Sequence, residues 1–177
     1  GLVHLPRKIE CFDISNLQGT DVVASCAAFT DARPDKARYR RYRIRDSDGQ
    51  NDIAAMAEAV RRRILRGKDE GELPDLMVID GGKAQLDAAL EVVRDLKIDA
   101  FDIVSLANAR SGKAAVAPLS EFERVFKPDL IVPIVLDQNA PELQLLVRAR
   151  DEAHRFAITY HRQLRGKAQT TSLLELV

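Results

Sequence analysis

The strongest constraint on the fold of this chain comes from a short, largely apolar run, KIECFDIS at residues 8–15, in which Asp13 lies between Phe12 and Ile14. A continuous apolar run indicates a strand buried on both faces, as in the middle of a sheet covered by helices. A carboxylate in such a strand is costly to bury unless it meets a counter-charge or a metal ion. Asp13 is therefore either satisfied by a buried partner or part of a functional site.

Two more strands are expected directly after this run. DVVASCAAF at 21–29 and RYRRYRIR at 38–45 are set apart by polar turns that contain Gly or Pro. Two hairpin-like connections in succession predict an antiparallel meander.

The spacing of the apolar residues then becomes helical. Helices are predicted over 52–66, 81–96 and 141–166, the last with Pro in its first turn and Gly at its end, and strands over 73–80 and 102–107. Between the last strand and the last helix, AAVAPL and LIVPIVL resemble short strands that prolines limit. This order predicts an α/β fold, in which an antiparallel meander and alternating helices and strands form a mixed central sheet flanked by helices.

Length and composition fit one domain. The 177 residues, 46% of them hydrophobic, suffice for a substantial core. We expect a leader at 1–6, the folded domain at 7–166 and a C-terminal segment at 167–177 that leads toward another module. Because the first residue is not Met, we expect the chain to be a piece of a longer protein.

Several classes of protein do not fit the sequence. No apolar run approaches the ~18 residues of a membrane span. Cys11 and Cys26 form no CxxC pair, so we expect reduced, half-buried strand residues, as in a cytoplasmic protein, and not a zinc site or disulfide framework. The GGK at 81–83 lacks the spacing of a phosphate loop, so a Rossmann-like nucleotide enzyme is a distant alternative and no small-molecule substrate is expected.

Two further carboxylates occupy positions where sites form. Asp80 ends the strand LMVID, and ligands of α/β sheets gather outside the carboxyl ends of strands. Asp52 opens the first long helix. Each also has an ordinary structural explanation, because Asp52 fits a helix N-cap and Asp80 before Gly-Gly fits a turn.

His154 falls within the apolar face of the last helix, so we expect it to point toward the sheet. A step of ~100° per residue gathers that face from Leu143, Leu146, Val147, Arg150, Ala153, His154, Ala157, Ile158 and His161. A lone His in this setting is more often a hydrogen-bonded core residue than a ligand. If Asp13 and Asp80 end opposite it, the three groups suit a divalent cation, either Mg²⁺ or the more nitrogen-tolerant Mn²⁺. The pattern gives Arg150 no role.

Basic residues form two clusters in a chain whose 27 basic and 27 acidic residues sum to zero. Arg148, Arg155 and Arg162 recur every seven residues and form a ridge beside the apolar face. The strand at 38–45 carries the second cluster, which includes Arg41 and Arg43. A solvated helix flank and a charged edge strand explain both clusters, but guanidinium rows also suit a phosphate backbone. Lys83, beside Asp80, would add a point charge for a phosphate.

Four stretches together resemble one known family. IECFDISNLQGTDVVAS, YRRYRI, DLMVIDGGKAQLDAAL and RDEAHRFAITYHRQLR are similar to the C-terminal endonuclease domain of the UvrC subunit of bacterial nucleotide excision repair. The resemblance covers roughly residues 7–170. It implies an RNase H-like fold with an Asp-Asp-His site, and divalent-metal-dependent cutting of the damaged strand of double-stranded DNA on the 5′ side of the lesion.

The resemblance also assigns residues and partners. It implies Asp13, Asp80 and His154 as the metal-binding and catalytic residues, with Asp52 tied to the same cut as a secondary candidate. It implies a UvrB–DNA complex as the partner of the full-length protein, and little activity of the isolated domain. Asn16 and Asn108 depart from the family pattern, which usually has His and commonly Lys there. A non-catalytic RNase H-like module that binds DNA or protein is the alternative.

Overall fold

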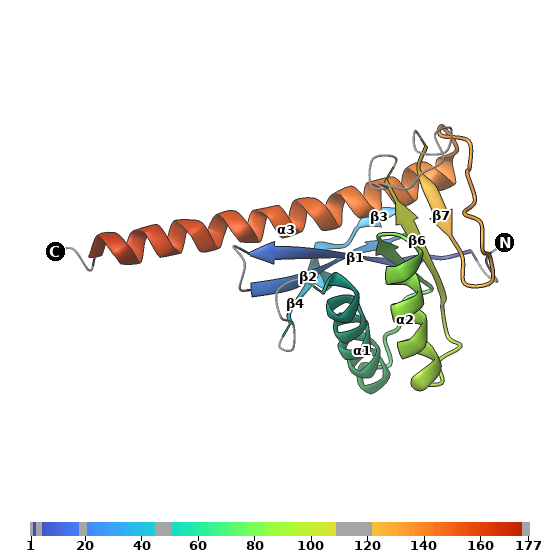
Figure 1. Cartoon of the computed structure of the whole chain (residues 1–177), viewed down its shortest axis with the longest axis horizontal. Helices are drawn as coiled ribbons and strands as arrows, with labels where there is room; N and C mark the ends of the chain where they lie inside the picture. Colours follow the sequence, from blue (N-terminus) through green and yellow to red (C-terminus); the bar gives the residue numbers. More distant parts are fainter. Residues whose placement is uncertain (1, 3–4, 18–20, 45–50, 109–121, 175–177) are drawn as a thin grey trace.

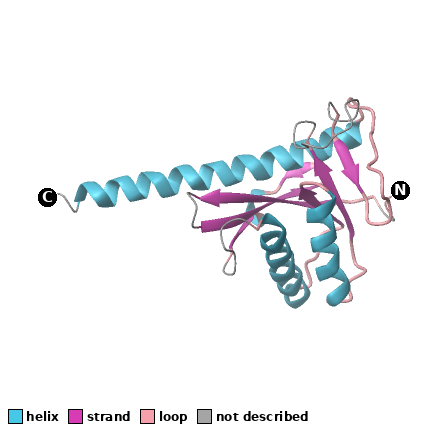
Figure 2. Cartoon of the chain, viewed as in Figure 1, coloured by secondary structure: helices cyan, strands magenta, loops and turns pink. Residues whose placement is uncertain are grey.

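A single mixed sheet lies between two unequal layers of helices (Figures 1 and 2). The computed structural model describes residues 2, 5–17, 21–44, 51–108 and 122–174. Its strands are β1 (Lys8–Leu17), β2 (Asp21–Thr30), β3 (Arg33–Pro34), β4 (Arg40–Arg43), β5 (Leu76–Asp80), β6 (Asp102–Ala107) and β7 (Arg124–Phe126). Its helices are the 3-10 turn η1 (Lys36–Arg38), α1 (Asp52–Glu70), α2 (Lys83–Asp95) and α3 (Pro141–Leu174).

The sheet confirms the predicted meander and the alternating half that follows it. The strand order is β3-β2-β1-β5-β6-β7, with β4 also paired to β2. β1 pairs antiparallel with β2 and parallel with β5, and β5 pairs parallel with β6. The carboxyl ends of the three central strands β1, β5 and β6 therefore share one edge of the sheet.

Alternating side chains of the central strands supply two separate cores. Phe12 and Met77 face α1 and α2, while Cys11 and Val78 face α3. Both cysteines are free and completely buried, and not half-buried as expected. Burial on both faces explains why these strands appear in the sequence as continuous apolar runs.

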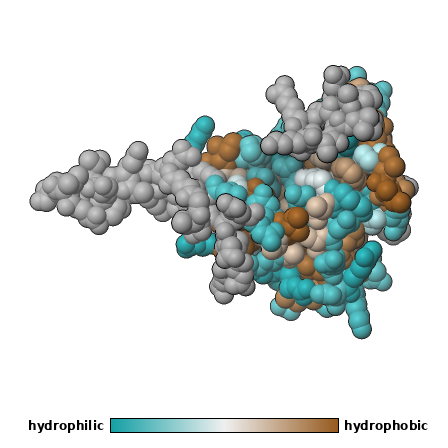
Figure 3. Space-filling view, in the orientation of Figure 1, coloured by the Kyte–Doolittle hydropathy of each residue, from teal (hydrophilic) through white to brown (hydrophobic). Residues whose placement is uncertain are grey.

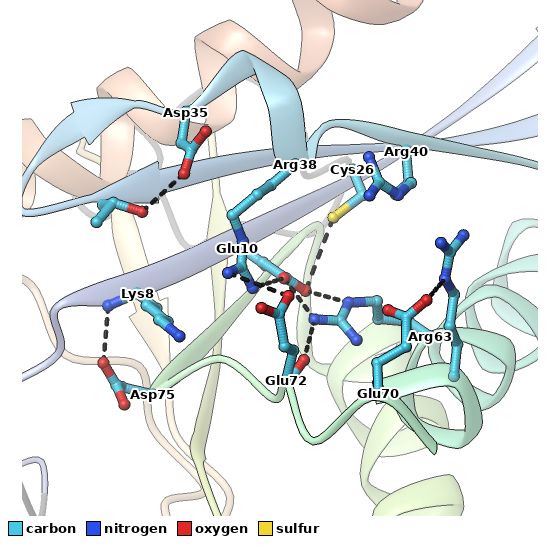
Figure 4. A network of polar contacts seen from close by, with 12 residues as sticks. Lys8, Glu10, Cys26, Asp35, Arg38, Arg40, Arg63, Glu70, Glu72 and Asp75 are labelled. Atoms are coloured by element: carbon cyan, nitrogen blue, oxygen red, sulfur yellow. Dashed lines mark hydrogen bonds and ion pairs between the residues drawn. The ribbon is translucent and has the colours of Figure 1, made fainter. Parts of the chain in front are cut away.

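A buried ion pair fixes α1 against β1 (Figure 4). Glu10 is 3% exposed and accepts two hydrogen bonds of 2.7 Å, from Nε and Nη2 of Arg63. Nη2 of Arg63 also donates to the backbone oxygen of Glu72 at 2.6 Å. Because the geometry is bidentate, the pair fixes both the rotation of α1 and its position along the strand.

Two local predictions were wrong, and one strand was not predicted. LIVPIVL makes only one isolated bridge, between Val125 and Ile134, and Ile131 is 94% exposed. The edge of β6 pairs instead with β7, a strand that was not predicted. Gly166 does not end the last helix, which continues to Leu174, since one glycine costs a helix only ~1 kcal/mol. AAVAPL lies outside the described residues.

Apolar side chains also gather on the surface at the end of the molecule nearest the N-terminus (Figure 3). Leu5 and Val132 are among the most exposed apolar residues. A neighbouring groove of about 520 Å³ is lined mainly by aliphatic side chains, among them Ile9, Leu76 and Val104. The groove lies toward the amino ends of β1 and β5, at the opposite end of these strands from Asp13 and Asp80. No described helix is long and apolar enough to cross a membrane.

Candidate active site

Asp13 and Asp80 are neighbours on adjacent parallel strands. Phe12 pairs with Ile79, so the next residue of each strand is an aspartate. Both aspartates belong to the alternating set that faces α3, and their carboxyl groups share a hydrogen bond. The fold thus brings together two carboxyl groups that lie 67 positions apart in the sequence.

The surroundings of this pair do not fully compensate its charge. Burial is the main cause of a raised pKa for both carboxyl groups, and the charge of Asp13 helps raise the pKa of Asp80 to about 7. Asp13 is 6% exposed, and its Oδ2 atom is buried without a hydrogen-bond partner. A buried carboxyl group and a partly buried one that share a hydrogen bond favour the uptake of a proton or a cation between them.

His154 contacts this pair from the rim of α3. Its Nδ1 atom lies 3.5 Å from Oδ2 of Asp13, and its side chain is 62% exposed. His154 therefore points toward the sheet as expected, but it is exposed and does not lie within the buried face. Ala153 and Ala157 occupy the buried positions and let α3 approach β1 closely. The imidazole consequently reaches both the buried carboxyl group and solvent.

Asp52 lies near the pair, at the start of α1. The N-cap of this helix is Asn51, whose side chain accepts from the backbone nitrogen of Ala54 at 3.0 Å, so the assignment of Asp52 as N-cap was wrong by one residue. Oδ1 of Asp52 accepts from Nδ2 of Asn16 at 3.5 Å. The negative charge of Asp52 also contributes to the raised pKa of Asp13.

The structure gives Arg150 a partner that the sequence pattern did not. Its guanidinium is 11% exposed and lies 2.6 Å from Oε2 of Glu123 and 3.2 Å from Oδ1 of Asp151. Its positive charge also opposes the raised pKa of Asp80. A charged residue within a buried helix face is a sequence signal for a buried counter-ion, but Glu123 lies in the stretch that the sequence resolved least.

The predicted phosphate-binding residues have different surroundings. Arg148, Arg155 and Arg162 are exposed along the flank of α3. Arg155 pairs with Glu152, its Nε 2.7 Å from Oε2, and Arg148 donates to the backbone oxygen of Ala32 at 3.4 Å. The ridge therefore lies beside His154, at the surface.

The other predicted phosphate-binding residues lie on β4 and at the start of α2. Nζ of Lys83 lies 2.8 Å from Oδ1 of Asp87. Arg43 is exposed. Arg41 is half-buried and stacks on two aromatic rings of α3, those of Phe156 at 3.7 Å and Tyr160 at 4.6 Å. Arg41 thus contributes to the packing of α3, whatever else it binds.

Within the described part of the chain, no three His, Cys, Asp or Glu side chains converge closely enough to hold one metal ion as they stand. The carboxyl groups of Asp13 and Asp80 nevertheless lie on neighbouring strands, with the imidazole of His154 next to them. Carboxylate oxygen and imidazole nitrogen are ligands that Mg²⁺ and Mn²⁺ accept. The chemistry of these donors therefore fits a divalent cation.

Comparison with protein families gives a match over most of the chain. The family described as the UvrC RNase H endonuclease domain matches residues 1–158. UvrABC system protein C of Geobacter metallireducens is 47% identical over 99% of this chain, and that of Gloeobacter violaceus is 44% identical over 98%. The chain spans 29% and 27% of these relatives, so it corresponds to a part of each.

Solved structures give the same fold at low sequence identity. The catalytic domain of human Endonuclease V aligns with a TM-score of 0.54 and 13% identity, over 91% of this chain and 85% of that one. Endonuclease V of Ciona intestinalis, solved with a 24mer DNA containing an inosine, aligns with a TM-score of 0.51 and 10% identity, over 90% of this chain and 87% of that one. These neighbours confirm the predicted RNase H-like fold.

Proposed function

This chain belongs to the UvrC RNase H endonuclease domain family, and from that premise we propose that it is the divalent-metal-dependent endonuclease domain that makes the 5′ incision in the damaged strand during nucleotide excision repair. The observation that carries the proposal is the Asp13–Asp80 pair at the carboxyl edge of the sheet, with His154 beside it. Endonuclease V of Ciona intestinalis binds DNA with a related fold, which supports DNA as the substrate class.

The residues that would hold Mg²⁺ or Mn²⁺ are Asp13 and Asp80, with His154 as the third ligand or as a proton acceptor. A bound divalent cation would supply a water of lowered pKa and neutralise the charge that develops on the phosphate. The raised pKa values of the two carboxyl groups indicate what the cation would replace, namely the proton that they share. Metal binding should therefore release protons near neutral pH.

His154 gains a defined orientation from Asp13. An Nδ1–H group directed at Oδ2 of Asp13, 3.5 Å away, would leave the Nε2 lone pair of the imidazole on the exposed side. That lone pair would accept a proton from the attacking water or bind the cation. Partial exposure favours either role, because the scissile phosphate has to approach from solvent.

The basic residues at the surface would hold DNA through its phosphates without reading its sequence. Arg148, Arg155 and Arg162 follow the flank of α3 on one side of His154, and Lys83 lies at the start of α2, three residues after Asp80. We include Asp52 as a secondary acidic residue for the 5′ cut. In the longer protein the domain would act on a UvrB–DNA complex, and alone it would cut DNA weakly or not at all.

The test is an incision assay with a lesion-containing DNA duplex, the longer protein that carries this domain and its repair partners. Asp13→Ala should abolish the 5′ cut while the isolated chain keeps its fold, because the change removes a buried charge. Asp95→Ala, which alters an exposed carboxylate at the end of α2, should cut normally. Full 5′ incision by Asp13→Ala would refute the assignment.

A non-catalytic module that binds DNA or a protein is the second candidate. The observation in its favour is that, in the described region, no three potential ligand side chains converge on one point. Crystals soaked in Mn²⁺ distinguish the two candidates by anomalous scattering. A peak between Asp13, Asp80 and His154 supports the nuclease, and its absence at high Mn²⁺ supports the binding module.

A further inference from the structure

Three polar residues form one row across the sheet beneath α3. Asp13 of β1 pairs with Ser25 of β2, and Ser25 pairs with Arg41 of β4. Residues paired in this way point to the same face of a sheet. Cys11, Ala27 and Tyr39 lie two positions from Asp13, Ser25 and Arg41 in the chain and belong to the core under α3. Residues two positions apart in a strand point to the same face, so the side chains of the row also face α3.

Each residue of this row has a buried polar atom without a hydrogen-bond partner. These atoms are Oδ2 of Asp13, Oγ of Ser25 and Nε of Arg41. They are three of the five such side-chain atoms in the part of the chain that the structure describes. Since buried polar groups are nearly always paired in folded proteins, three neighbouring exceptions require a common explanation.

The hydrogen-bonding capacities of the three atoms complement one another. The Nε–H of Arg41 is a donor, the Ser25 hydroxyl both accepts and donates, and Oδ2 of Asp13 is an acceptor. We infer that Arg41, Ser25 and Asp13 form a hydrogen-bond relay in which Ser25 is a positioning residue for the Asp13 carboxylate. The inference rests on the proposed function, because it concerns how a ligand of the metal is held.

The Asp13–Ser25 step of the relay lies within reach of ordinary side-chain motion. Directly opposed residues of antiparallel strands have Cβ atoms about 4.5–5.5 Å apart, which a carboxylate and a hydroxyl together span. A change of the Ser25 side chain between staggered rotamers redirects its oxygen at small energetic cost. Ser25 is fully buried, so water does not compete freely for its hydroxyl.

Arg41 gives the relay a fixed end. Its guanidinium lies over the ring of Phe156 at 3.7 Å, and its Nη2 donates to the backbone oxygen of that residue at 3.3 Å. Phe156 lies two residues after His154 on α3, so Arg41 contacts this helix close to the imidazole. The relay would therefore coordinate the position of the carboxylate with the position of the helix that carries the imidazole.

The relay would orient the Asp13 carboxylate as a ligand of the metal ion. When one oxygen of a carboxylate holds a metal ion, hydrogen bonds to the other oxygen fix its direction, and loss of such outer contacts typically weakens metal binding about 10- to 100-fold. In this site, Ser25 and His154 would supply those hydrogen bonds to Oδ2 of Asp13.

Titration of the whole chain with MnCl₂ by calorimetry tests the relay. Ser25→Ala should weaken Mn²⁺ binding about tenfold or more. Thermal unfolding of the same variant without metal should stay cooperative, with a midpoint lowered by only a few degrees, because the change removes the hydrogen bonds of a single hydroxyl. Thr30→Val is the matched control. It removes a hydroxyl from the same strand, and that hydroxyl donates to Asp35 and not to the relay. Its Mn²⁺ affinity should match that of the unmodified chain.

A double-mutant cycle tests the connection to Arg41. Arg41→Met keeps an extended side chain but removes the Nε–H, and it should also weaken Mn²⁺ binding. Combined with Ser25→Ala it should weaken binding little beyond the single serine change, because both changes break one relay. Unchanged Mn²⁺ affinity in Ser25→Ala, or multiplicative effects in the pair, would overturn the relay while leaving the metal site intact. No Mn²⁺ binding by the unmodified chain would refute the metal site and the relay with it.

Discussion

Asp80 would face opposite demands from folding and from the proposed metal binding. Burial beside Asp13 raises its pKa to about 7, well above the ordinary value near 3.8. Between these two values the folded chain binds a proton that the unfolded chain has already released, so stability falls as pH rises from about 4 to about 7. A bound cation would offset this cost.

Replacement of Asp80 by Asn should therefore stabilise the metal-free chain at neutral pH. The amide that replaces the carboxyl group carries no charge, so the gain should reach roughly 2–4 kcal/mol at pH 8 and nearly vanish at pH 4. Urea unfolding in EDTA at several pH values measures the difference between the two proteins. Asp129→Asn changes an exposed carboxylate and should show no such dependence, and an equal gain for Asp80→Asn at pH 4 and 8 would contradict the electrostatic explanation.

At the scale of single residues, the sequence identified candidate site residues but not their contacts. Asp13 and Asp80 stood out because a carboxylate within or at the end of an apolar run needs an explanation. The exposure of His154 was not predictable, because helical periodicity gives the direction of a side chain but not the distance of the helix axis from the sheet. The pairing of Arg150 with Glu123 depends on a long-range contact that local patterns do not contain.

Among the helices, α1 depends on a glycine for its close approach to neighbouring chain segments. A Cβ atom at Gly67 would lie 2.4 Å from Nη1 of Arg63 and 3.0 Å from the backbone oxygen of Glu72. Arg63 is held by two hydrogen bonds to Glu10, so it does not move aside without cost. The glycine is thus required by the groups packed against it, which are the ion-paired Arg63, the side chain of Leu73 and the backbone of Glu72, and not by the helix itself.

Gly67→Ala should destabilise the chain by roughly 2–4 kcal/mol, although alanine is the better helix former. Urea unfolding at neutral pH measures this loss. Gly71→Ala is the control, because Gly71 has a φ of +67° but no atom within 4 Å of an added Cβ. It should cost only about 1–2 kcal/mol, the strain of a left-handed residue. A larger loss for Gly71→Ala would show that backbone conformation, and not the ion pair, is the stricter requirement.

The elements themselves were mostly predictable, and the exceptions have physical causes. β1, β2, β5 and β6 came from apolar runs, and α1 and α2 from helical spacing, because local periodicity records which faces are buried. β7 has only three residues, too few for a period, and is stabilised by the free edge of β6. LIVPIVL has the composition of a strand, but the structure gives it no ladder to join, so Ile131 and Val132 remain exposed while Ile134 and Leu136 pack partly against the core.

The whole molecule has no net charge, but its charges are not evenly distributed. Arg148, Arg155 and Arg162 lie along one flank of α3, and this helix projects well beyond the sheet (Figure 1). Polyanion binding depends on such local clusters and not on the sum over the chain. The domain should therefore bind DNA weakly and in a salt-dependent manner despite its neutrality.

Removal of single arginines from this flank should reduce the salt dependence of DNA binding. Each phosphate contact contributes about one unit to the slope of log K against log salt, so Arg162→Gln should lower the slope by about 1. Arg155→Gln should lower it less, because Glu152 already neutralises part of its charge. Fluorescence anisotropy of a labelled duplex at salt concentrations from about 50 to 200 mM measures these slopes. Arg94→Gln removes an exposed charge from α2, on the opposite face of the sheet, and should leave the slope unchanged. Equal reductions for Arg94→Gln and Arg162→Gln would show that DNA responds to total charge, and the flank of α3 would then have no special role in holding the substrate.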